Sequence, residues 1–245
     1  MKKSEEFLIN TKKILDNIYA TQLACIEQTA AKMADAICSG ANIFVYGTGH
    51  AAIMAEEMHG RAGGLVPVNP LFCASLLPYQ PVITACELER IPGVASAILQ
   101  TSPIKPGDLL IIHSVAARNP AVVEMAIKAR DMGVFVVGLV NITFASGVAS
   151  RDPSGKLLQE VCDIVIDNCG EFGDASISIE GMPGKTAPTS TISCAFIANM
   201  LTLLTCEYLL ERGVDPPVLL SANIDNADSH NQALYKQYEA HVFYS

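Results

Sequence analysis

The stretch NIFVYGTGH, residues 42–50, joins a short apolar run to a turn with two glycines. The run from Asn42 to Tyr46 is rich in residues that favour β-strands. The residues that follow, 51–62, carry apolar side chains at helical spacing. A strand, a glycine turn and a helix in this order form the opening unit of a doubly wound α/β fold. We therefore predict that the first core strand of a parallel sheet lies here.

The same order recurs along the rest of the chain. Apolar runs predict further strands at 109–113, 134–140 and 161–167, and helices at 120–132 and 189–212. Pro120 suits the first position of a helix, where its missing N–H would have no partner. The strands are continuous apolar runs, as expected when helices cover both faces of a sheet. We predict a mainly parallel sheet with right-handed crossovers.

The segments outside this core indicate a single domain over residues 1–245. Residues 4–39 have helical spacing and predict one or two N-terminal helices, which Ser39 and Gly40 end. The α/β core and a C-terminal tail then occupy residues 40–245. Residues 65–81 and 141–155 are rich in proline and glycine, and we expect irregular structure there. No polar linker divides the chain.

Composition excludes several classes of partner. The formal net charge of -9 argues against nucleic acid, which requires a basic surface. The eight cysteines are scattered without a CxxC pair, so we interpret them as reduced thiols of a cytoplasmic protein. The charged N-terminus lacks a signal-peptide core. The apolar stretch 192–210 contains several polar residues, which favours a buried core helix over a membrane span.

Three polar turns, residues 47–50, 114–119 and 185–191, should meet at one edge of the sheet. This edge is formed by the carboxyl ends of the parallel strands, beyond which ligands bind. Each turn precedes a predicted helix, whose first N–H groups attract anions. The third turn adds three consecutive hydroxyls and a lysine, although simple capping of the helix is an alternative. The predicted ligand-binding residues are Gly47, Thr48, Gly49, Ser114, Arg118, Asn119, Lys185, Thr189, Ser190 and Thr191.

The first turn matches neither common nucleotide-binding motif. Ala52 occupies the third glycine position of the dinucleotide fingerprint, and no acidic residue follows at the required distance. No Gly-Lys-Ser/Thr follows either, which excludes a P-loop. The histidines and cysteines lack the spacing of a metal site. We therefore expect no cofactor and no metal.

Several motifs together resemble the sugar isomerase (SIS) domain family, and the similarity is greatest to bacterial single-domain members. The motifs are YGTGHAAIMAEEMHGRAGGLVPVNP, GDLLIIHSVAARNP, VCDIVIDNCGEFGDASI, APTSTI and PPVLLSANIDNADSHN, in that order from residue 42 onward. The resemblance implies a Rossmann-like, five-stranded parallel sheet flanked by helices, and a phosphosugar site built from the polar turns. It also implies a homodimer or homotetramer. We expect residues 62–70 and the N-terminal helices to pack against another subunit.

The chain departs from the family pattern at two turns. Ala51 stands where these proteins usually have a serine, and Ala116 and Ala117 replace the second serine and the glycine of a Ser-x-Ser-Gly run. A hydrogen bond to a charged oxygen contributes roughly 1.5–3 kcal/mol, so the loss of two hydroxyls should weaken phosphate binding. Either Lys185, Arg118 and the 189–191 turn compensate, or the ligand is not a phosphosugar.

Aldose-ketose isomerisation moves a proton between adjacent carbons and needs a base and an acid. His50 lies in the first turn, and we predict Glu57 on the following helix as the base. Glu57 is four residues from Arg61, so an exposed ion pair is an alternative. SIS isomerases can take a histidine from a neighbouring subunit, which makes His230 the third catalytic candidate.

The sequence thus predicts a sugar-phosphate-binding protein, in the form of an aldose-ketose isomerase or a related phosphosugar-processing enzyme. Two alternatives stay open. One is a binding or sensor protein without catalysis, which Ala51 and Ala116 favour. The other is an enzyme for an unphosphorylated or amino sugar. The chain shows no helix-turn-helix region of the kind found in SIS transcription regulators.

Overall fold

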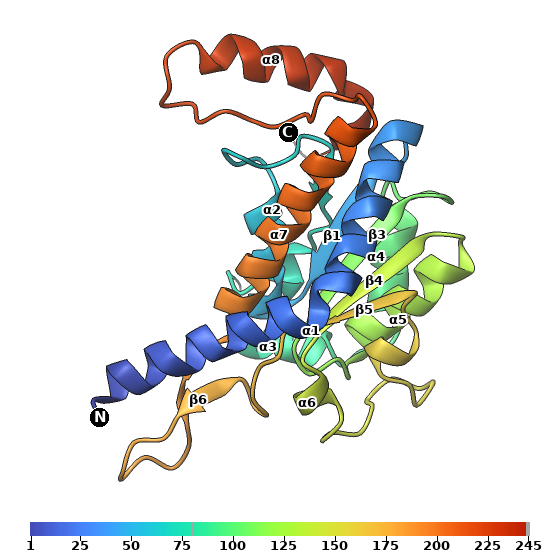
Figure 1. Cartoon of the computed structure of the whole chain (residues 1–245). Coiled ribbons are helices and arrows are strands. Elements are labelled where there is room, and N and C mark those ends of the chain that lie inside the picture. Colours follow the sequence, from blue (N-terminus) through green and yellow to red (C-terminus); the bar gives the residue numbers. More distant parts are fainter. Residues whose placement is uncertain (80, 244–245) are drawn as a thin grey trace.

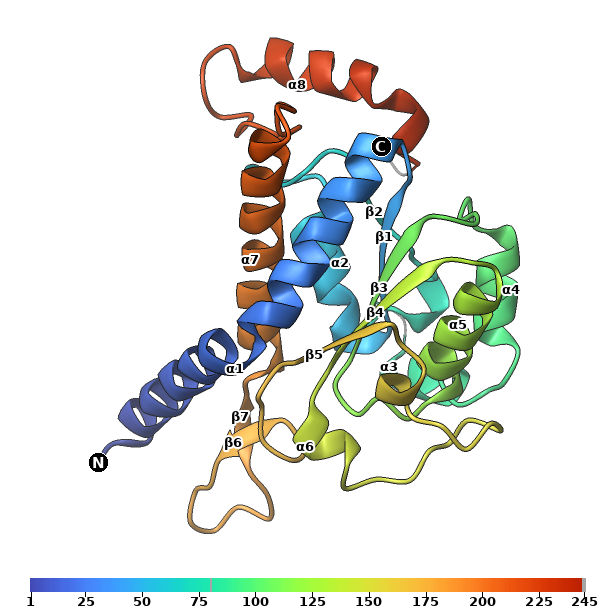
Figure 2. The ribbon, with the colours of Figure 1, turned by 45° about the vertical axis from the view of Figure 1, so that its right-hand side comes forward.

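A computed structural model describes residues 1–79 and 81–243. Its centre is a parallel sheet of five strands in the order β2-β1-β3-β4-β5 (Figures 1 and 2). The strands are β1 (Ile43–Gly47), β2 (Val68–Pro70), β3 (Leu109–Ser114), β4 (Phe135–Val140) and β5 (Ile164–Asp167). This arrangement confirms the predicted doubly wound α/β fold.

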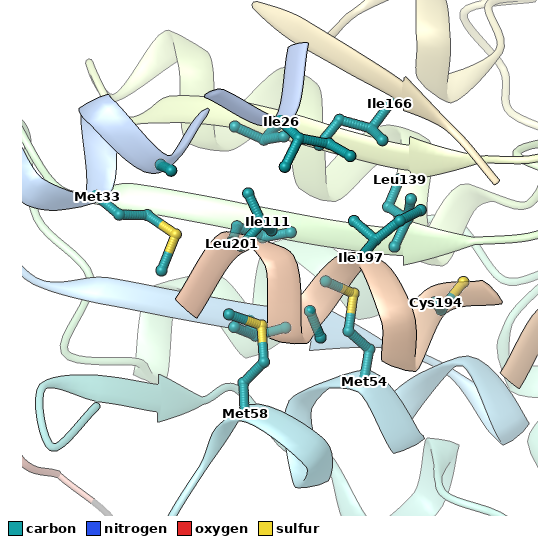
Figure 3. Close-up of a cluster of buried hydrophobic side chains, with 14 of the residues drawn as sticks. Ile26, Met33, Met54, Met58, Ile111, Leu139, Ile166, Cys194, Ile197 and Leu201 are labelled. Atoms are coloured by element: carbon teal, nitrogen blue, oxygen red, sulfur yellow. The ribbon is translucent and has the colours of Figure 1, made fainter. Parts of the chain in front are cut away.

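Helices cover both faces of the sheet. One face carries α1 (Lys3–Ser39), α2 (Ile53–Met58) and α7 (Ser190–Glu211), and the other carries α4 (Val94–Thr101) and α5 (Pro120–Asp131). Figure 3 shows the first of these cores, where Met33, Met54 and Ile197 meet Ile111 and Leu139 of the strands. Successive strand residues alternate between the two cores, which explains the continuous apolar runs in the sequence.

The remaining elements are short and lie around the ends of the sheet. They are η1 (Gly49–Ala52), η2 (Ala74–Leu76), α3 (Val82–Leu88), α6 (Ile142–Ala145), η3 (Leu158–Glu160), α8 (Ala227–Gln237), η4 (Glu239–His241) and the antiparallel pair β6 (Ala175–Ile177) and β7 (Thr186–Pro188). Strand β2 has three residues and α3 seven, so neither shows a clear periodicity in the sequence.

Several predicted boundaries need correction. The N-terminal region forms one helix, and its first turns project beyond the body of the protein (Figure 1). The helix expected over 51–62 is instead the 3₁₀ turn η1 followed by α2, which ends at Met58. His59 has an extended backbone, and Gly60 has a φ of +60°, which stops the helix there. The fourth predicted strand begins at Ile164, because η3 occupies Leu158–Glu160.

The segment expected to face another subunit is largely internal. Leu65, Val66 and Val68 are at most 3 % exposed, because β2 pairs with β1 and Leu65 bridges to Val218. Residues 64–70 are therefore unavailable to a partner, and this part of the prediction was wrong.

Helix α7 is long and apolar enough to cross a membrane by length and composition, which by itself is weak evidence. Its Ile197 and Leu201 are fully buried against α1, α2 and the sheet, as predicted for a core helix. Leu203 and Leu210 lie on its outer side and are exposed.

The C-terminal segment closes the amino end of the sheet, away from the turns. Asp108 accepts bonds from the backbone N–H of Asn42 (2.8 Å) and from its side chain (3.0 Å). His241 Nδ1 lies 2.9 Å from Asn42 Oδ1, and Asn69 bonds to the backbone of His241 and Phe243. Asn42, Asn69 and Asp108 are at most 1 % exposed, so this network is part of the core.

Candidate functional site

A cavity of about 540 Å³ opens at the carboxyl ends of β1 and β3. The chain passes from β1 to β2 on one side and continues with β3 on the other, so this is the switch point of the sheet. Ligands of open α/β sheets bind at such a point. The cavity is lined by Thr48, Gly49, His50, Ala51, Pro78, Val82, Ala85, Cys86, Glu89, Ser114, Val115, Ala116, Asn119, Phe144, Gly173 and Asp174.

The first wall is the turn after β1, which folds back on itself. Ala51 N–H donates to Thr48 O (3.0 Å), and a Cβ on Gly47 would lie 2.5 Å from Ala51 O. Any larger residue at position 47 would therefore displace the turn. Gly49 has a φ of +54°, in the left-handed region that favours glycine. Together the two glycines place His50 at the cavity.

His113, near the end of β3, is buried and hydrogen-bonds to the backbone of this turn. Its Nδ1 lies 2.9 Å from Ala51 O, and its Nε2 lies 3.0 Å from Cys194 Sγ. Burial lowers the pKa of His113 to about 4 and raises the pKa of Cys194 to about 12. Both groups are therefore neutral near pH 7, so Nδ1–H donates to the carbonyl and the thiol donates to Nε2. The pair positions the turn and supplies no nucleophile.

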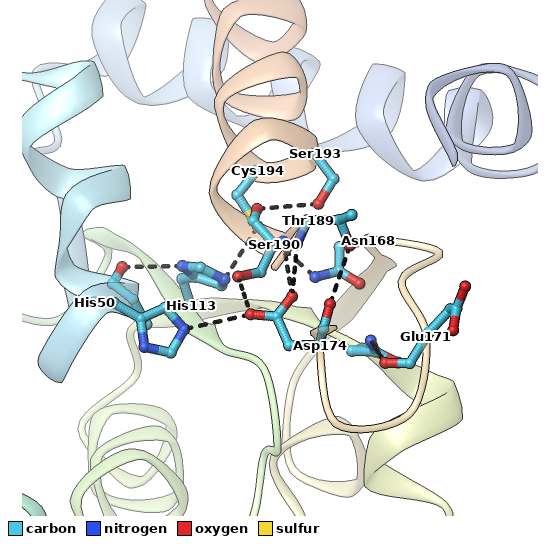
Figure 4. A network of polar contacts seen from close by, with 11 residues as sticks. His50, His113, Asn168, Glu171, Asp174, Thr189, Ser190, Ser193 and Cys194 are labelled. Atoms are coloured by element: carbon cyan, nitrogen blue, oxygen red, sulfur yellow. Dashed lines mark hydrogen bonds and ion pairs between the residues drawn. The ribbon is translucent and has the colours of Figure 1, made fainter. Parts of the chain in front are cut away.

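Asp174 occupies the N-terminus of α7, as Figure 4 shows. Its Oδ1 accepts the N–H groups of Thr189 (3.1 Å) and Ser190 (2.8 Å), and its Oδ2 accepts the hydroxyl of Ser190 (2.7 Å). The same Oδ2 lies 4.0 Å from Nε2 of His50. Asp174 thus caps a helix on one side and faces a cavity histidine on the other.

Glu89, just beyond the end of α3, lies against the first turn. A Cβ on Gly49 would lie 3.3 Å from Glu89 Oε1, and Asn119 Nδ2 donates to Glu89 Oε2 (2.9 Å). Arg151 donates to the other end of the same amide, Asn119 Oδ1 (3.2 Å). This contact fixes which way the Asn119 amide points and leaves Oε1 directed at the turn.

A family model described as SIS domain matches residues 6–141 of the chain. This chain belongs to the SIS domain family. It is 41% identical to a UPF0309 protein of Shouchella clausii, over 89% of this chain and 91% of that protein. It is 38% identical to a UPF0309 protein of Oceanobacillus iheyensis, over 98% of each.

Solved structures show the same fold at low identity. The SIS-domain chain matches a phosphoheptose isomerase from Francisella tularensis with a TM-score of 0.57 and 15% identity, over 84% of this chain and 97% of that one. A phosphoheptose isomerase from Neisseria gonorrhoeae matches with a TM-score of 0.52 and 14% identity, over 82% of this chain and 96% of that one. These matches confirm the five-stranded SIS fold.

The structure brings half of the predicted ligand-binding residues to one place in the SIS-domain chain. Thr48, Gly49, Ser114 and Asn119 line the cavity together with the catalytic candidate His50. Gly47 lies beneath them and shapes the turn. The first two polar turns therefore meet as expected from their places in the sheet.

The third turn contributes differently from the prediction. Thr189 and Ser190 are buried and bond to Asp174, so this helix start already holds a carboxylate of the chain itself. Thr191 lines a smaller neighbouring cavity. Lys185 forms an ion pair with Glu171 at the surface. The hydrogen bonds of this turn therefore match the alternative interpretation, simple capping of the helix. The side chain that caps the helix is Asp174 and not one of the three hydroxyls.

Three further candidates lie outside the large cavity. Glu57 forms an ion pair with Arg61 and accepts a bond from Asn199 Nδ2 (2.9 Å), beside the small cavity that His50 also lines. Arg118 lies in the second turn, with its Nε buried and without a partner. His230 is on α8, bonded to Val218 O (3.1 Å), and so lies at the opposite end of the sheet within this chain. Its catalytic role stays a prediction that depends on a second subunit.

Sequence reasoning missed Glu89 and Asp174. Glu89 belongs to a region where no helix was predicted, because α3 is short and exposes two of its apolar residues, Val82 and Ile83. Asp174 stands in the motif GEFGDASI, and its φ of +68° is a strained value for a non-glycine residue. A glycine followed by aspartate ahead of a hydroxyl-rich helix start was the available signal.

The described residues, 1–79 and 81–243, contain no group of three histidine, cysteine, aspartate or glutamate side chains that could hold a metal ion.

Proposed function

We propose that this chain is a sugar isomerase that moves a proton between adjacent carbons of a sugar bound in the large cavity. One observation carries the proposal. A carboxylate, Glu89, and an imidazole, His50, line the same cavity at the switch point of an SIS fold. Aldose-ketose isomerisation needs these two kinds of group within reach of one substrate.

Glu89 is the base in this proposal. Asn119 binds one of its oxygens, and the other faces the turn that carries His50. A fixed carboxylate loses little orientational freedom when it removes a proton, which is how positioned bases contribute to rate. Glu57 was the base predicted from the sequence, and its ion pair with Arg61 holds it outside this cavity.

His50 is the acid. Asp174 Oδ2 lies 4.0 Å from His50 Nε2, so a carboxylate stands beside the imidazole at the cavity. The side chain of His50 is 59% exposed, which lets it exchange protons with water and rotate toward a bound sugar. Ring opening and protonation of the sugar oxygens are the steps that require such an acid.

The solved relatives support sugar chemistry of this kind. The matches from Francisella tularensis and Neisseria gonorrhoeae are both named phosphoheptose isomerases. Our proposal extends the class of reaction to this chain and leaves the identity of the sugar to experiment.

A panel of aldoses and ketoses, with and without phosphate, tests the proposal. NMR in D₂O follows conversion and the incorporation of solvent deuterium at the carbon that loses its proton. We expect turnover of at least one sugar, and at least a 100-fold loss in Glu89→Gln, because a positioned base contributes about 10²–10⁴ in rate. Full activity of that variant would refute Glu89 as the base.

A sugar-binding protein without catalysis is the second candidate. Alanine at positions 51 and 116, both lining the cavity, removes hydroxyls that the family pattern would supply. This candidate predicts that a sugar raises the melting temperature while no member of the panel is converted.

We also propose a homodimer or homotetramer. Leu8, Ile9 and Tyr19 of α1 and Leu203 and Leu210 of α7 are large apolar side chains that are exposed. A second subunit that covers them is also the means by which His230 would reach a cavity. A monomer in light scattering would refute both statements. The cytoplasmic location remains a prediction from the cysteines.

A further inference from the structure

Two of the three helix starts at the cavity, those of α5 and α7, already hold acceptors from the chain itself. Asp174 accepts the N–H groups of Thr189 and Ser190 at the start of α7. At the start of α5, Ala121 N–H donates to the backbone carbonyl of Glu89 (3.1 Å). Free backbone amides at helix starts are a common binding site for a phosphate group. The amides at the starts of α5 and α7 are bonded within the protein, so they do not provide a phosphate site. The third start, after β1, is the four-residue 3₁₀ turn η1, whose Ala51 N–H bonds to Thr48 O.

The charged groups on the cavity wall also oppose a phosphate. Among the described lining residues the ionisable ones are Glu89, Asp174, His50 and the thiol of Cys86, and neither lysine nor arginine is present. A phosphate carries close to two negative charges at neutral pH. Placed in this cavity it would lie near two carboxylates, and like charges at short range repel.

The nearest cations do not cancel this charge at the wall. Lys185 is paired with Glu171. Arg151 donates to Asn119 Oδ1, so the Asn119 amide stands between that guanidinium and Glu89. Arg90 forms an ion pair with Glu87 (2.8 Å) on the outer side of α3. Arg118 lies one residue before Asn119 and does not line the cavity.

Beyond the hydroxyls of Thr48 and Ser114 and the amide of Asn119, the rest of the wall offers few side-chain hydrogen-bond donors. Ala51, Ala85, Ala116, Val115 and Phe144 are apolar, and two of them replace hydroxyls of the family pattern. A bound ligand must therefore meet the carboxylates with its own donors. An ammonium group does so best, because hydrogen bonds between two charged groups are about twice as strong as neutral ones.

We propose that the cavity selects a sugar that carries a free amine and no phosphate. The proposal rests on the proposed function, since it assumes that the cavity is the sugar site. The amine donates to Glu89 or Asp174, and the sugar ring lies against the alanine and valine side chains. It corresponds to the amino-sugar alternative left open by the sequence.

Calorimetry with matched sugars tests the proposal. The ligands are glucosamine, galactosamine and mannosamine, each beside its N-acetyl form and its 6-phosphate, at neutral pH and low salt. We expect at least one amine to bind 10-fold or more tightly than both of its partners. Glu89→Gln and Asp174→Asn should each reduce that preference several-fold. Glu87→Gln, two residues earlier but paired with Arg90 outside the cavity, should leave it unchanged.

Three results would overturn the proposal. The first is tighter binding of a 6-phosphate than of its parent sugar. The second is a higher melting temperature of the protein in millimolar inorganic phosphate. The third is the absence of binding by all three amines. Turnover of a phosphosugar that depends on Glu89 would refute this inference and leave the isomerase proposal intact. Binding of an amine without turnover of any sugar would support this inference and refute the isomerase proposal.

Discussion

The two ends of the sheet carry buried polar networks that differ in what they face. At the amino end, Asp108, Asn42 and Asn69 bond to one another's chain segments and to the C-terminal residues, and the network is closed. At the carboxyl end, the carboxylates of Asp174 and Glu89 accept some hydrogen bonds from within the protein and also line the large cavity. In our proposal, the first network therefore serves stability and the second serves a ligand.

The largest expected difference between the two ends of the sheet is the effect of a substitution on turnover. Glu89→Gln should lower turnover at least 100-fold with little change in stability, because the amide keeps the size of the side chain but is a poor base. Asp108→Asn, the matched change at the amino end, should leave turnover of the folded protein unchanged. Steady-state rates on the sugar that the wild type converts give both values, and a similar loss in the two variants would break the comparison.

The second effect is on stability at the amino end. Asp108→Ala removes the acceptor of Asn42 N–H, of the Asn42 amide and of Lys105 N–H. Buried donors without acceptors cost about 1–3 kcal/mol each, so we expect a loss of about 4 kcal/mol. Urea denaturation measures it. A loss below about 1 kcal/mol, the lower bound for one such donor, would mean that water replaces the carboxylate and that this end is open.

The third effect is a pH dependence that arises from His113. Burial holds its pKa at about 4, below the ordinary value of 6.5. As the pH falls below 6.5, the unfolded chain takes up a proton that the folded protein refuses until about pH 4, so stability falls over this range. The loss should reach about 3 kcal/mol at the acid end.

Denaturation curves between pH 7 and pH 4 measure that slope. His113→Asn removes the titrating group, and its slope should be shallower than that of the wild type. An unchanged slope in the variant would assign the pH dependence to other groups.

The smallest effect concerns the cap on α7. Asp174→Ala frees the N–H groups of Thr189 and Ser190, and loss of an N-terminal cap costs about 0.5–2 kcal/mol. We expect about 1 kcal/mol by urea denaturation, the middle of the range for loss of one helix cap and less than for Asp108→Ala. A loss equal to that at position 108 would contradict the distinction between the two ends.

The fold could be predicted from the sequence because its strands are apolar throughout. Strands β1, β3 and β4 are buried along almost their whole length, and each is followed by a turn and a helix start, which glycine or proline marks after β1 and β3. Strand β2 and helices α3 and α4 were missed, since short elements with exposed apolar side chains such as Ile83 have no distinct pattern.

The candidate site could be predicted only in part. Turns that directly follow strands are placed by the sheet, so Thr48, His50 and Ser114 were found. Glu89 and Asp174 reach the cavity from a short helix and a loop, whose positions depend on long-range contacts with Asn119 and Ser190. Spacing along the sequence does not encode such contacts, which is why Glu89 and Asp174 were not among the predicted candidates.

The carboxylate at the start of α7 also bears on how ligand preference can evolve. The φ of Asp174 is +68°, a value that glycine adopts without strain. Exchange of Asp174 for glycine would leave the backbone in place and expose two amides and a hydroxyl at the positive end of a long helix dipole. Under our proposal, one substitution therefore separates a helix end that repels anions from one that attracts them. A mutant library focused on this position would test whether the ligand preference changes with it.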